Sequence, residues 1–403
     1  MTTTINNEHK KLNVPNLRFP EFQGEWEEHL LGNISDVTKL AGFEFTKYVT
    51  YEDNGNIIAI RGLNCKNGSL DLRDVKYIDN SDFSKLSRSK LYTGDILYTY
   101  VGTVGEVAVV DKNDKYYLAP NVSRIRLSKD YNSDFIKQLL GSKKFYNQIV
   151  FPLIATSSQP ALSMENLRKF KLKVPSIREQ TKIASLLNAI DERIATQNKI
   201  IEDLKKLKSA IIEIEYTPNT KNTSPIGDVI EQISKRNKNN AIQNVLSVSN
   251  RQGFIKQSDQ FENRNVASED TSNYKIVEQN DFAFNPARIN VGSIARLTTF
   301  EKGIVSPMYV CFRTQENVAP EYIDYFFESK HFYCEIQKRL EGSVRQCLSF
   351  EGLCNIPLSL PSFEIQQRIG KRIFTLGQKI KMETDLLELL NKQKQYLLRQ
   401  MFI

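Results

Sequence analysis

The chain has 403 residues, of which 40% are hydrophobic and 25% are charged, the usual mix of a soluble globular protein. This length suggests two or three domains; no apolar run approaches the roughly 18 residues that cross a bilayer, and the N-terminus has no secretion signal. The net charge of +8 permits DNA binding without requiring it, because no segment is overwhelmingly basic. Five cysteines without a C-x-x-C pair favour a reduced, cytoplasmic protein.

Residues 1–177 are predicted to form a first globular domain of α/β (α+β) type. Short β-branched and aromatic runs, such as "GNIIAIRGL" and "DILYTYV", alternate with Gly, Asn and Asp turns, and the helical stretch "SDFIKQLLGSKKFYNQI" follows them. Loops rich in Arg, Lys, Asn and Gln are expected at residues 60–68, 98–103 and 155–160. The domain therefore places its strands first and its helices after them.

A long helix is predicted over residues 178–216. Its apolar residues recur at alternating spacings of four and three, which is a sustained heptad seam. The seam consists of Ile183, Leu187, Ile190, Ile194, Ile201, Leu204 and Ile211, with Gln197 and Lys208 at the two polar positions. At 1.5 Å per residue a seam of some 35 residues is about 50 Å long, which exceeds a small domain.

The second part of the chain repeats this order, and Ile369 follows Ile183 by 186 residues. The polar linker "YTPNTKNTSP" leads into a second predicted globular domain at residues 217–363, and a second long helix is predicted at residues 364–403. "SSQPALSMENLRKFKLKVPSIREQ" aligns with "SVRQCLSFEGLCNIPLSLPSFEIQ". The second seam keeps every apolar position of the first, as Ile369, Ile373, Leu376, Ile380, Leu387, Leu390 and Leu397.

Two matched seams favour an antiparallel coiled coil over two separate core helices. Residues 217–363 are long enough to bring the chain back, and an antiparallel pair relates the two halves by a pseudo-twofold axis. Facing Gln or Glu and Lys residues in the seam would then fix the register of the two helices.

A search for catalytic motifs finds none that is complete. No histidine has a metal-ligand partner at helical spacing, and no phosphate-binding loop is present. The tetrapeptide "SPMY" at residues 306–309 is similar to the motif with which amino-methyltransferases hold a target amine, but it has Met in the third position and no glycine-rich cofactor loop accompanies it. The start of a strand is the simpler interpretation, and the chain is expected to be non-catalytic.

Two globular modules on a rigid rod could instead recognise two sites about one turn of B-DNA apart, ~34 Å. Arg, Lys, Asn and Gln read base edges in the major groove. The candidate DNA-binding residues are Arg61, Asn64, Lys66, Tyr98, Tyr100, Thr103, Ser157, Ser158 and Gln159 in the first half, and Arg251, Lys256, Asn285, Arg288, Asn290, Arg345 and Gln346 in the second. A solvated turn explains any one of them equally well, but their recurrence at equivalent places favours the set.

The order "GD-[IL]…G…G" followed by "SSQPALSMENLRKFKLKVPSIREQTKIASLLNAIDERI" resembles the specificity subunit of bacterial type I restriction-modification systems, and the resemblance covers nearly the whole chain. Its most specific residues are Gln159, Leu162, Ser163, Leu167, Val174, Pro175, Glu179, Gln180 and Ile183, with Gln346, Leu348, Ser349, Leu353, Leu360, Pro361, Gln366 and Ile369 in the second half. The second half departs from the pattern in having Ile365 where the first half has Glu179.

The resemblance implies two target recognition domains that each read one half of an interrupted DNA site. It also implies paired helices that set the spacing and dock two modification subunits. These methyltransferase partners would bring S-adenosylmethionine and methylate adenine, and restriction (motor-nuclease) subunits would bring ATP and Mg, so no cofactor is expected in this chain. A DNA-specificity subunit is the leading hypothesis, beside two alternatives: a two-headed protein-binding scaffold and a fused methyltransferase remnant.

Overall fold

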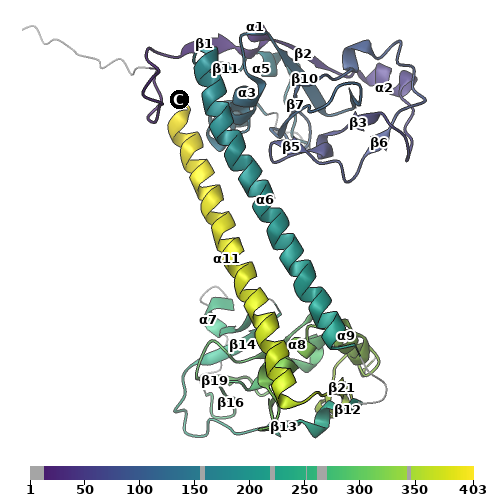
Figure 1. The fold of residues 1–403 in the computed structure, drawn as a ribbon, viewed down its shortest axis with the longest axis vertical. Coiled ribbons are helices and arrows are strands. Elements are labelled where there is room, and N and C mark those ends of the chain that lie inside the picture. Colours follow the sequence, from purple (N-terminus) through teal and green to yellow (C-terminus); the bar gives the residue numbers. More distant parts are fainter. Residues whose placement is uncertain (1–12, 155–158, 218–222, 251, 261–269, 343–345) are drawn as a thin grey trace, which may run out of the picture. The chain divides into compact units, whose positions relative to one another are not determined.

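The computed structural model describes residues 13–154, 159–217, 223–250, 252–260, 270–342 and 346–403. The chain folds as two compact units, which we name unit 1 (residues 1–197 and 386–403) and unit 2 (residues 198–385). Each unit holds one globular domain of strands and short helices together with parts of two long helices, α6 (Ile177–Glu215, teal in Figure 1) and α11 (Phe363–Met401, yellow). The mixed α/β class and the two long helices are confirmed, whereas the division into four segments stays a prediction.

Two larger sheets form the globular part of unit 1. The antiparallel sheet β2-β10-β7-β8 consists of Ser35–Lys39, Val122–Leu127, Ile96–Thr99 and Val107–Val109. The sheet β6-β3-β9 consists of Lys76–Tyr77, Ile58–Ile60 and Tyr116–Leu118, with β3 and β9 parallel. Two further pairs join β1 (Glu27–Leu30) to β11 (Lys171–Val174) and β4 (Cys65–Lys66) to β5 (Ser69–Leu70). The α-helices are α1 (Leu31–Ile34), α2 (Gly42–Tyr48), α3 (Ser133–Leu140), α4 (Lys143–Phe145) and α5 (Met164–Arg168).

Unit 2 repeats the four-stranded antiparallel sheet of unit 1, and its second sheet again contains one parallel pair but has four strands instead of three. Its antiparallel sheet β13-β20-β17-β18 consists of Ile230–Ile233, Val310–Thr314, Phe282–Phe284 and Ile294–Arg296. The sheet β15-β14-β19-β16 consists of Gly253–Lys256, Val245–Ser249, Lys302–Val305 and Lys275–Glu278, with β14 and β19 parallel. Strand β12 (Thr223–Pro225) pairs with β21 (Pro357–Ser359). The α-helices are α7 (Gln257–Gln260), α8 (Pro320–Phe326), α9 (Lys330–Gln337) and α10 (Phe350–Cys354).

The central strand of each antiparallel sheet is buried on both faces, which explains its unbroken apolar sequence. Side chains alternate between the faces with a period of two residues. In β7, Ile96 and Tyr98 pack into one core cluster and Leu97 into another. In β17, Phe282 and Phe284 join one cluster and Ala283 the other. Each unit therefore has two core layers, with its central strand between them.

Every predicted apolar residue of the heptad seam in α6 and α11 is buried or half-buried. In unit 1, Leu187 near the start of α6 shares a core cluster with Leu398 near the end of α11. In unit 2, Ile211 near the end of α6 shares a cluster with Ile373 near the start of α11. In each unit the start of one long helix packs against the end of the other, so the two helices are antiparallel there.

The polar seam residues find partners that the sequence did not indicate. The amine of Lys394 lies 2.5 Å from a carboxylate oxygen of Asp191, which is on α6 but outside the seam. The amine of Lys208 lies 2.6 Å from Glu328, in the segment between α8 and α9. Both lysines therefore form ion pairs with acidic residues outside the seam. The sequence had predicted that they would face a Gln or Glu of the other seam, and these ion pairs differ from that prediction.

A buried glutamine joins each long helix to its domain. The side-chain oxygen of Gln180 accepts a hydrogen bond from the backbone N–H of Asn132, the residue that caps α3, at 2.9 Å, and its nitrogen donates to the carbonyl of Pro175 at 2.8 Å. Gln366 repeats both bonds with Ala319 and Pro361, each at 2.9 Å. Both glutamines are only 1% exposed. They therefore satisfy backbone groups that would otherwise be buried without a partner.

The departure from the repeat at Glu179 and Ile365 has a structural cause. Glu179 is 1% exposed, and the guanidinium of Arg18 donates to its two oxygens at 2.8 and 2.7 Å. Arg18 belongs to the segment before β1, whose Leu17 N–H also donates to the carbonyl of Gln400 near the end of α11. In unit 2 Ile365 is 37% exposed. The glutamate therefore anchors the N-terminal segment of unit 1.

Replacing either buried glutamine should destabilise its own unit. We expect Gln180→Ala and Gln366→Ala each to lower the free energy of unfolding by about 1–3 kcal/mol, because two buried hydrogen bonds are lost and backbone groups stay unsatisfied. Thermal and urea unfolding of the full chain would measure this. Gln367→Ala, at an exposed neighbouring position of α11, is the control. Losses equal to that of the control would contradict the role of the buried amides.

Candidate nucleic-acid interface

A cleft of about 360 Å³ opens in unit 1 where β3, β7 and β9 end. It is lined by Tyr51, Arg61, Gly62, Leu63, Thr99, Val101, Gly102, Thr103, Pro120, Asn121 and Gln159. Because β3 and β9 are parallel, their carboxyl ends meet at one edge, and the loops that follow them face each other there. The cleft brings together three of the predicted DNA-binding residues, Arg61, Thr103 and Gln159.

The loop after β7 is held by backbone hydrogen bonds. The Tyr100 N–H donates to the carbonyl of Asn121 at 3.1 Å, and the Gly102 N–H donates to Pro160 at 2.9 Å. Gly102 has a φ of +79° and Asn121 a φ of +72°, a conformation that glycine and asparagine adopt at lower cost than other residues. The turn therefore projects Thr103 to solvent on a fixed backbone.

The loop after β3 is held by Asn64, and this corrects its prediction as a DNA contact. Asn64 is fully buried. Its oxygen accepts from the Arg61 N–H at 3.0 Å, and its nitrogen donates to the carbonyls of Asp71 and Asp74 at 2.9 and 2.7 Å. Asp74 also binds the Arg61 Nη2 atom through its carboxylate at 2.8 Å. Asn64 therefore positions Arg61 and does not present its own amide to a ligand.

Two other predictions of DNA contact are wrong because the side chains are buried. Tyr98 is 0% exposed on β7 and packs edge-on against Phe170, with ring centroids 6.0 Å apart. Asn285 is 7% exposed, and its oxygen accepts from the Ala287 N–H at 3.1 Å, which caps the 3₁₀ helix Pro286–Val291. Both residue types suit DNA readout, but here one fills the core and the other begins a helix.

The remaining predictions divide by exposure. Lys66, Lys256, Arg288 and Gln346 are exposed, and Tyr100 and Asn290 are half-buried. Lys66 lies at the edge of a tight hairpin whose turn residues, Asn67 and Gly68, both have positive φ. Its amine is 4.0 Å from Asp71, and hydrogen bonds from Arg73 hold the pKa of that carboxyl well below its usual range. Ser157, Ser158, Arg251 and Arg345 lie outside the described residues.

Several residues of the cleft were missed by the sequence analysis. Tyr51 and Leu63 are 37% and 46% exposed, although large apolar side chains are normally covered. Burial of part of the ring raises the pKa of Tyr51, so the phenol stays neutral. Asn121 follows Pro120 in a turn, and this Pro-Asn pair was the available signal. No sequence feature marked Tyr51 as a residue of the site, because it precedes β3 in a stretch without a recognisable motif or periodicity.

Unit 2 presents an equivalent loop after β17. The Leu348 N–H donates to the carbonyl of Pro286 at 3.0 Å, just as the Leu162 N–H in unit 1 donates to Tyr100 at 2.8 Å. The 3₁₀ helix that begins at Pro286 carries Arg288, which is exposed and has no ion pair with any described residue. The two units therefore hold loops of different sequence at the same place.

The methyltransferase-like tetrapeptide has a structural role. Its residues form the turn between β19 and β20, and Tyr309 is 8% exposed. The Tyr309 carbonyl accepts a hydrogen bond from the amine of Lys275 at 2.6 Å, and its hydroxyl accepts one from the Val248 N–H at 3.4 Å. In the described part of the chain, no group of three or more His, Cys, Asp or Glu side chains could hold a metal ion.

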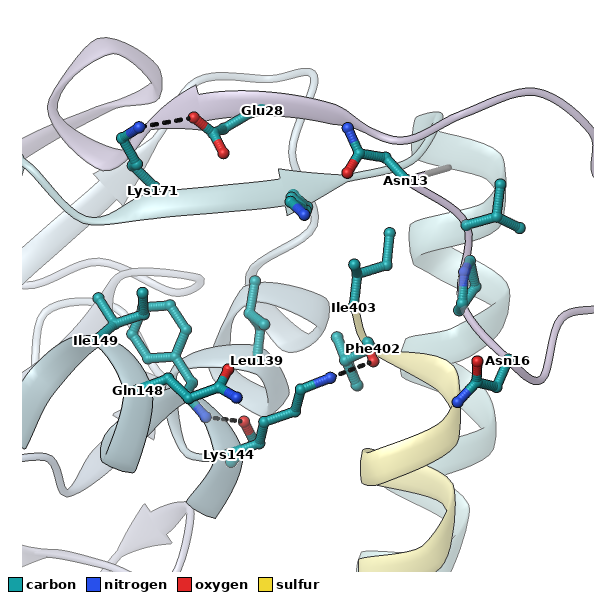
Figure 2. A pocket seen from close by; sticks show the side chains of 15 residues that line it. Asn13, Asn16, Glu28, Leu139, Lys144, Gln148, Ile149, Lys171, Phe402 and Ile403 are labelled. Carbon is teal, nitrogen blue, oxygen red and sulfur yellow. Dashed lines mark hydrogen bonds and ion pairs between the residues drawn. The ribbon is translucent and has the colours of Figure 1, made fainter. Parts of the chain in front are cut away.

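A second cavity in unit 1, of about 430 Å³, lies between the N-terminal segment and the end of α11 (Figure 2). Lys171 and Glu28 form an ion pair of 3.1 Å on one wall, and Lys144 donates to the carbonyl of Phe402 at 3.3 Å on another. This cavity is lined by the elements that join the domain to the helices, whereas the cleft lies at the strand ends.

None of the described helices is long and apolar enough to cross a membrane.

Comparison with known proteins identifies the family. The profile of the family described as Type I restriction modification DNA specificity domain matches residues 23–206 and again residues 218–392. The putative type I restriction enzyme MjaX specificity subunit of Methanocaldococcus jannaschii is 22% identical over 429 residues, which cover 96% of this chain and 93% of that protein. The type I restriction enzyme EcoKI specificity subunit of Escherichia coli is 27% identical over 123 residues, which cover 29% of this chain and 26% of that protein.

The fold is similar to solved structures as well. The crystal structure of the type I restriction-modification S subunit from M. genitalium matches with a TM-score of 0.62 at 15% identity, and the match covers 97% of this chain and 99% of that one. A chain from a study of the assembly of a type I restriction-modification system matches with a TM-score of 0.52 at 14% identity, covering 93% and 96%. The chain belongs to the family of type I restriction-modification DNA specificity subunits, and it carries two target recognition domains.

Proposed function

We propose that the loops at the carboxyl ends of β7 and β17 read the two halves of one interrupted DNA site, one half for each unit. The observation that carries this proposal is that both loops are held by an equivalent backbone hydrogen bond. The Leu162 N–H donates to the carbonyl of Tyr100 in unit 1, and the Leu348 N–H donates to the carbonyl of Pro286 in unit 2. Loops of different sequence held at one place on a repeated scaffold suit the reading of two different sequences.

The exposed side chains on these loops match the chemistry of base readout. Arg288, on the loop after β17, can form two hydrogen bonds to guanine. Gln159 lines the cleft beside the loop after β7, and a glutamine amide can form two hydrogen bonds to adenine. Lys66, on β4 of unit 1, and Lys256, at the end of β15 of unit 2, are exposed and would contact phosphates, which positions the protein without selecting a sequence. The moderate net charge fits a protein whose partners share the phosphate contacts.

The chain itself acts without catalysis in this proposal. Two modification subunits supply S-adenosylmethionine and methylate adenine, and restriction subunits supply ATP, Mg and DNA cleavage. The specificity subunit selects the DNA that these partners act on, and it works in the cytoplasm, where that DNA is found.

Exposed apolar stripes on the long helices offer docking surfaces for these partners. In unit 2, Ile200, Leu207 and Ile214 of α6 are 39%, 49% and 74% exposed and recur every seven residues. In unit 1, Leu389 and Tyr396 of α11 have the same spacing and are 61% and 54% exposed. Residues seven apart lie on one face of a helix in a coiled coil, so a partner helix could cover each stripe. One stripe in each unit fits two modification subunits.

Substitutions in the two loops should act on different half-sites. We expect Arg288→Ala to weaken or abolish reading of one half-site, by about 1–3 kcal/mol if it contacts a base, and Thr103→Ala to affect only the other. Adenine methylation mapped across the genome of cells that carry each variant would measure this. The control is Lys302→Ala, because Lys302 lies at the start of β19 and does not belong to the loop after β17.

Equal loss at both half-sites would contradict the assignment of one half to each unit. If methylation persisted at every site in cells that lack this chain while its partners are active, the DNA-reading role would fail. The alternative of a two-headed protein scaffold would then be preferred.

A charge placed in the unit 2 stripe should weaken assembly. We expect Leu207→Asp to reduce the share of complexes that contain two modification subunits, because the aspartate would have to lose its hydration in an apolar contact. Sedimentation of the purified complex would measure the stoichiometry. Ser209→Asp adds the same charge two residues along the helix, where it faces a different direction. Equal effects of the two variants would contradict docking on this stripe.

A further inference from the structure

The unit 1 cleft is hollow, and we infer that it takes one nucleobase of the first half-site after that base has rotated out of the DNA stack. The inference rests on the proposed function of the unit 1 loops. Base edges in the major groove are read by elements that protrude into it, such as a helix or a two-stranded ribbon. A concave site of about 360 Å³ instead receives a group that projects from the DNA, and an extrahelical base is such a group.

The walls of the cleft offer the stacking surface that an extrahelical base needs. Proteins that capture such bases place them between aromatic and apolar side chains and read the edge by hydrogen bonds. Tyr51, Leu63 and Val101 provide aromatic and aliphatic surface around this cleft. Tyr51 and Leu63 remain more than a third exposed in the free chain, so the stacking surface is open to a ligand.

Polar side chains on the wall of the cleft are held in place. Arg61 lines the cleft, although its Nε atom is buried away from solvent. Its Nη2 atom donates to both the carbonyl and the carboxylate of Asp74, at 2.9 and 2.8 Å, so the guanidinium is held in one orientation. The amides of Asn121 and Gln159 line the same cleft and add both donors and acceptors.

Glycine keeps the cleft open. A Cβ atom at Gly62 would lie 3.7 Å from the Asn121 Cβ and 3.9 Å from the Thr99 Cγ2, which are ordinary contact distances. A Cβ atom at this position therefore fits between the walls of the cleft. Gly62→Val narrows the cleft, which makes it a second test beside removal of the Tyr51 ring.

The test uses the complete complex of this chain with its partner subunits, bound to DNA that carries its recognition site. 2-Aminopurine replaces each adenine of the two strands of the first half-site in turn, since its fluorescence rises when it leaves the stack of DNA bases. We expect a several-fold rise at one position, lost in Tyr51→Ala and in Gly62→Val. The rise should persist in Tyr92→Ala, because this tyrosine has a similar exposure of 42% but lies before β7 rather than after it.

A mismatch opposite the same position should tighten binding by about tenfold, because an unpaired base costs less to rotate out. If no position brightened while the first half-site was still read, the inference would be overturned and the proposed function would stand. Brightening that survives both Tyr51→Ala and Gly62→Val would place the base in a partner subunit and would also overturn it. If the wild-type complex did not discriminate the first half-site at all, the proposed function itself would fail.

Discussion

The core of each unit depends on apolar stripes that both long helices bury together. Leu187 of α6 and Leu398 of α11 belong to one core cluster in unit 1, and Ile211 of α6 and Ile373 of α11 belong to one in unit 2. Packing of such a stripe, rather than helix propensity, supplies most of the stability of a helix in water. Each domain therefore completes its core with a helix end from the other half of the sequence.

This arrangement could be predicted from the sequence because a heptad seam is a local pattern, and its repetition 186 residues later implied a partner of equal length. The ion pairs could not be predicted in the same way. Lys208 pairs with Glu328 and Lys394 with Asp191, and neither acid belongs to the seam. Spacing along one helix indicates which side chains face inward. It does not indicate which carboxylate from another element lies within reach.

The sequence predicted which loops form the candidate site, but it predicted only some of the side chains that line it. Tyr98 could have been excluded, because its position two residues after Ile96 places both on one buried face of a strand. Asn64 and Asn121 could not be told apart by residue type. Asn64 turns inward to bind backbone carbonyls, whereas Asn121, at a positive φ, lines the cleft. An asparagine in a turn can do either, and the choice depends on the backbone around it.

The contacts that hold the repeated scaffold explain how its loops can differ. Gln180 and Gln366 bind backbone N–H and carbonyl groups, and the loops are anchored by the N–H of Leu162 and Leu348. Backbone groups are present whatever the side chain, so these anchors place almost no demand on the sequence of the loop that they hold. A loop with "YVGT" and a loop with "PARIN" can therefore occupy the same place. The sequence of each loop can therefore change without the loss of the backbone hydrogen bonds that hold it.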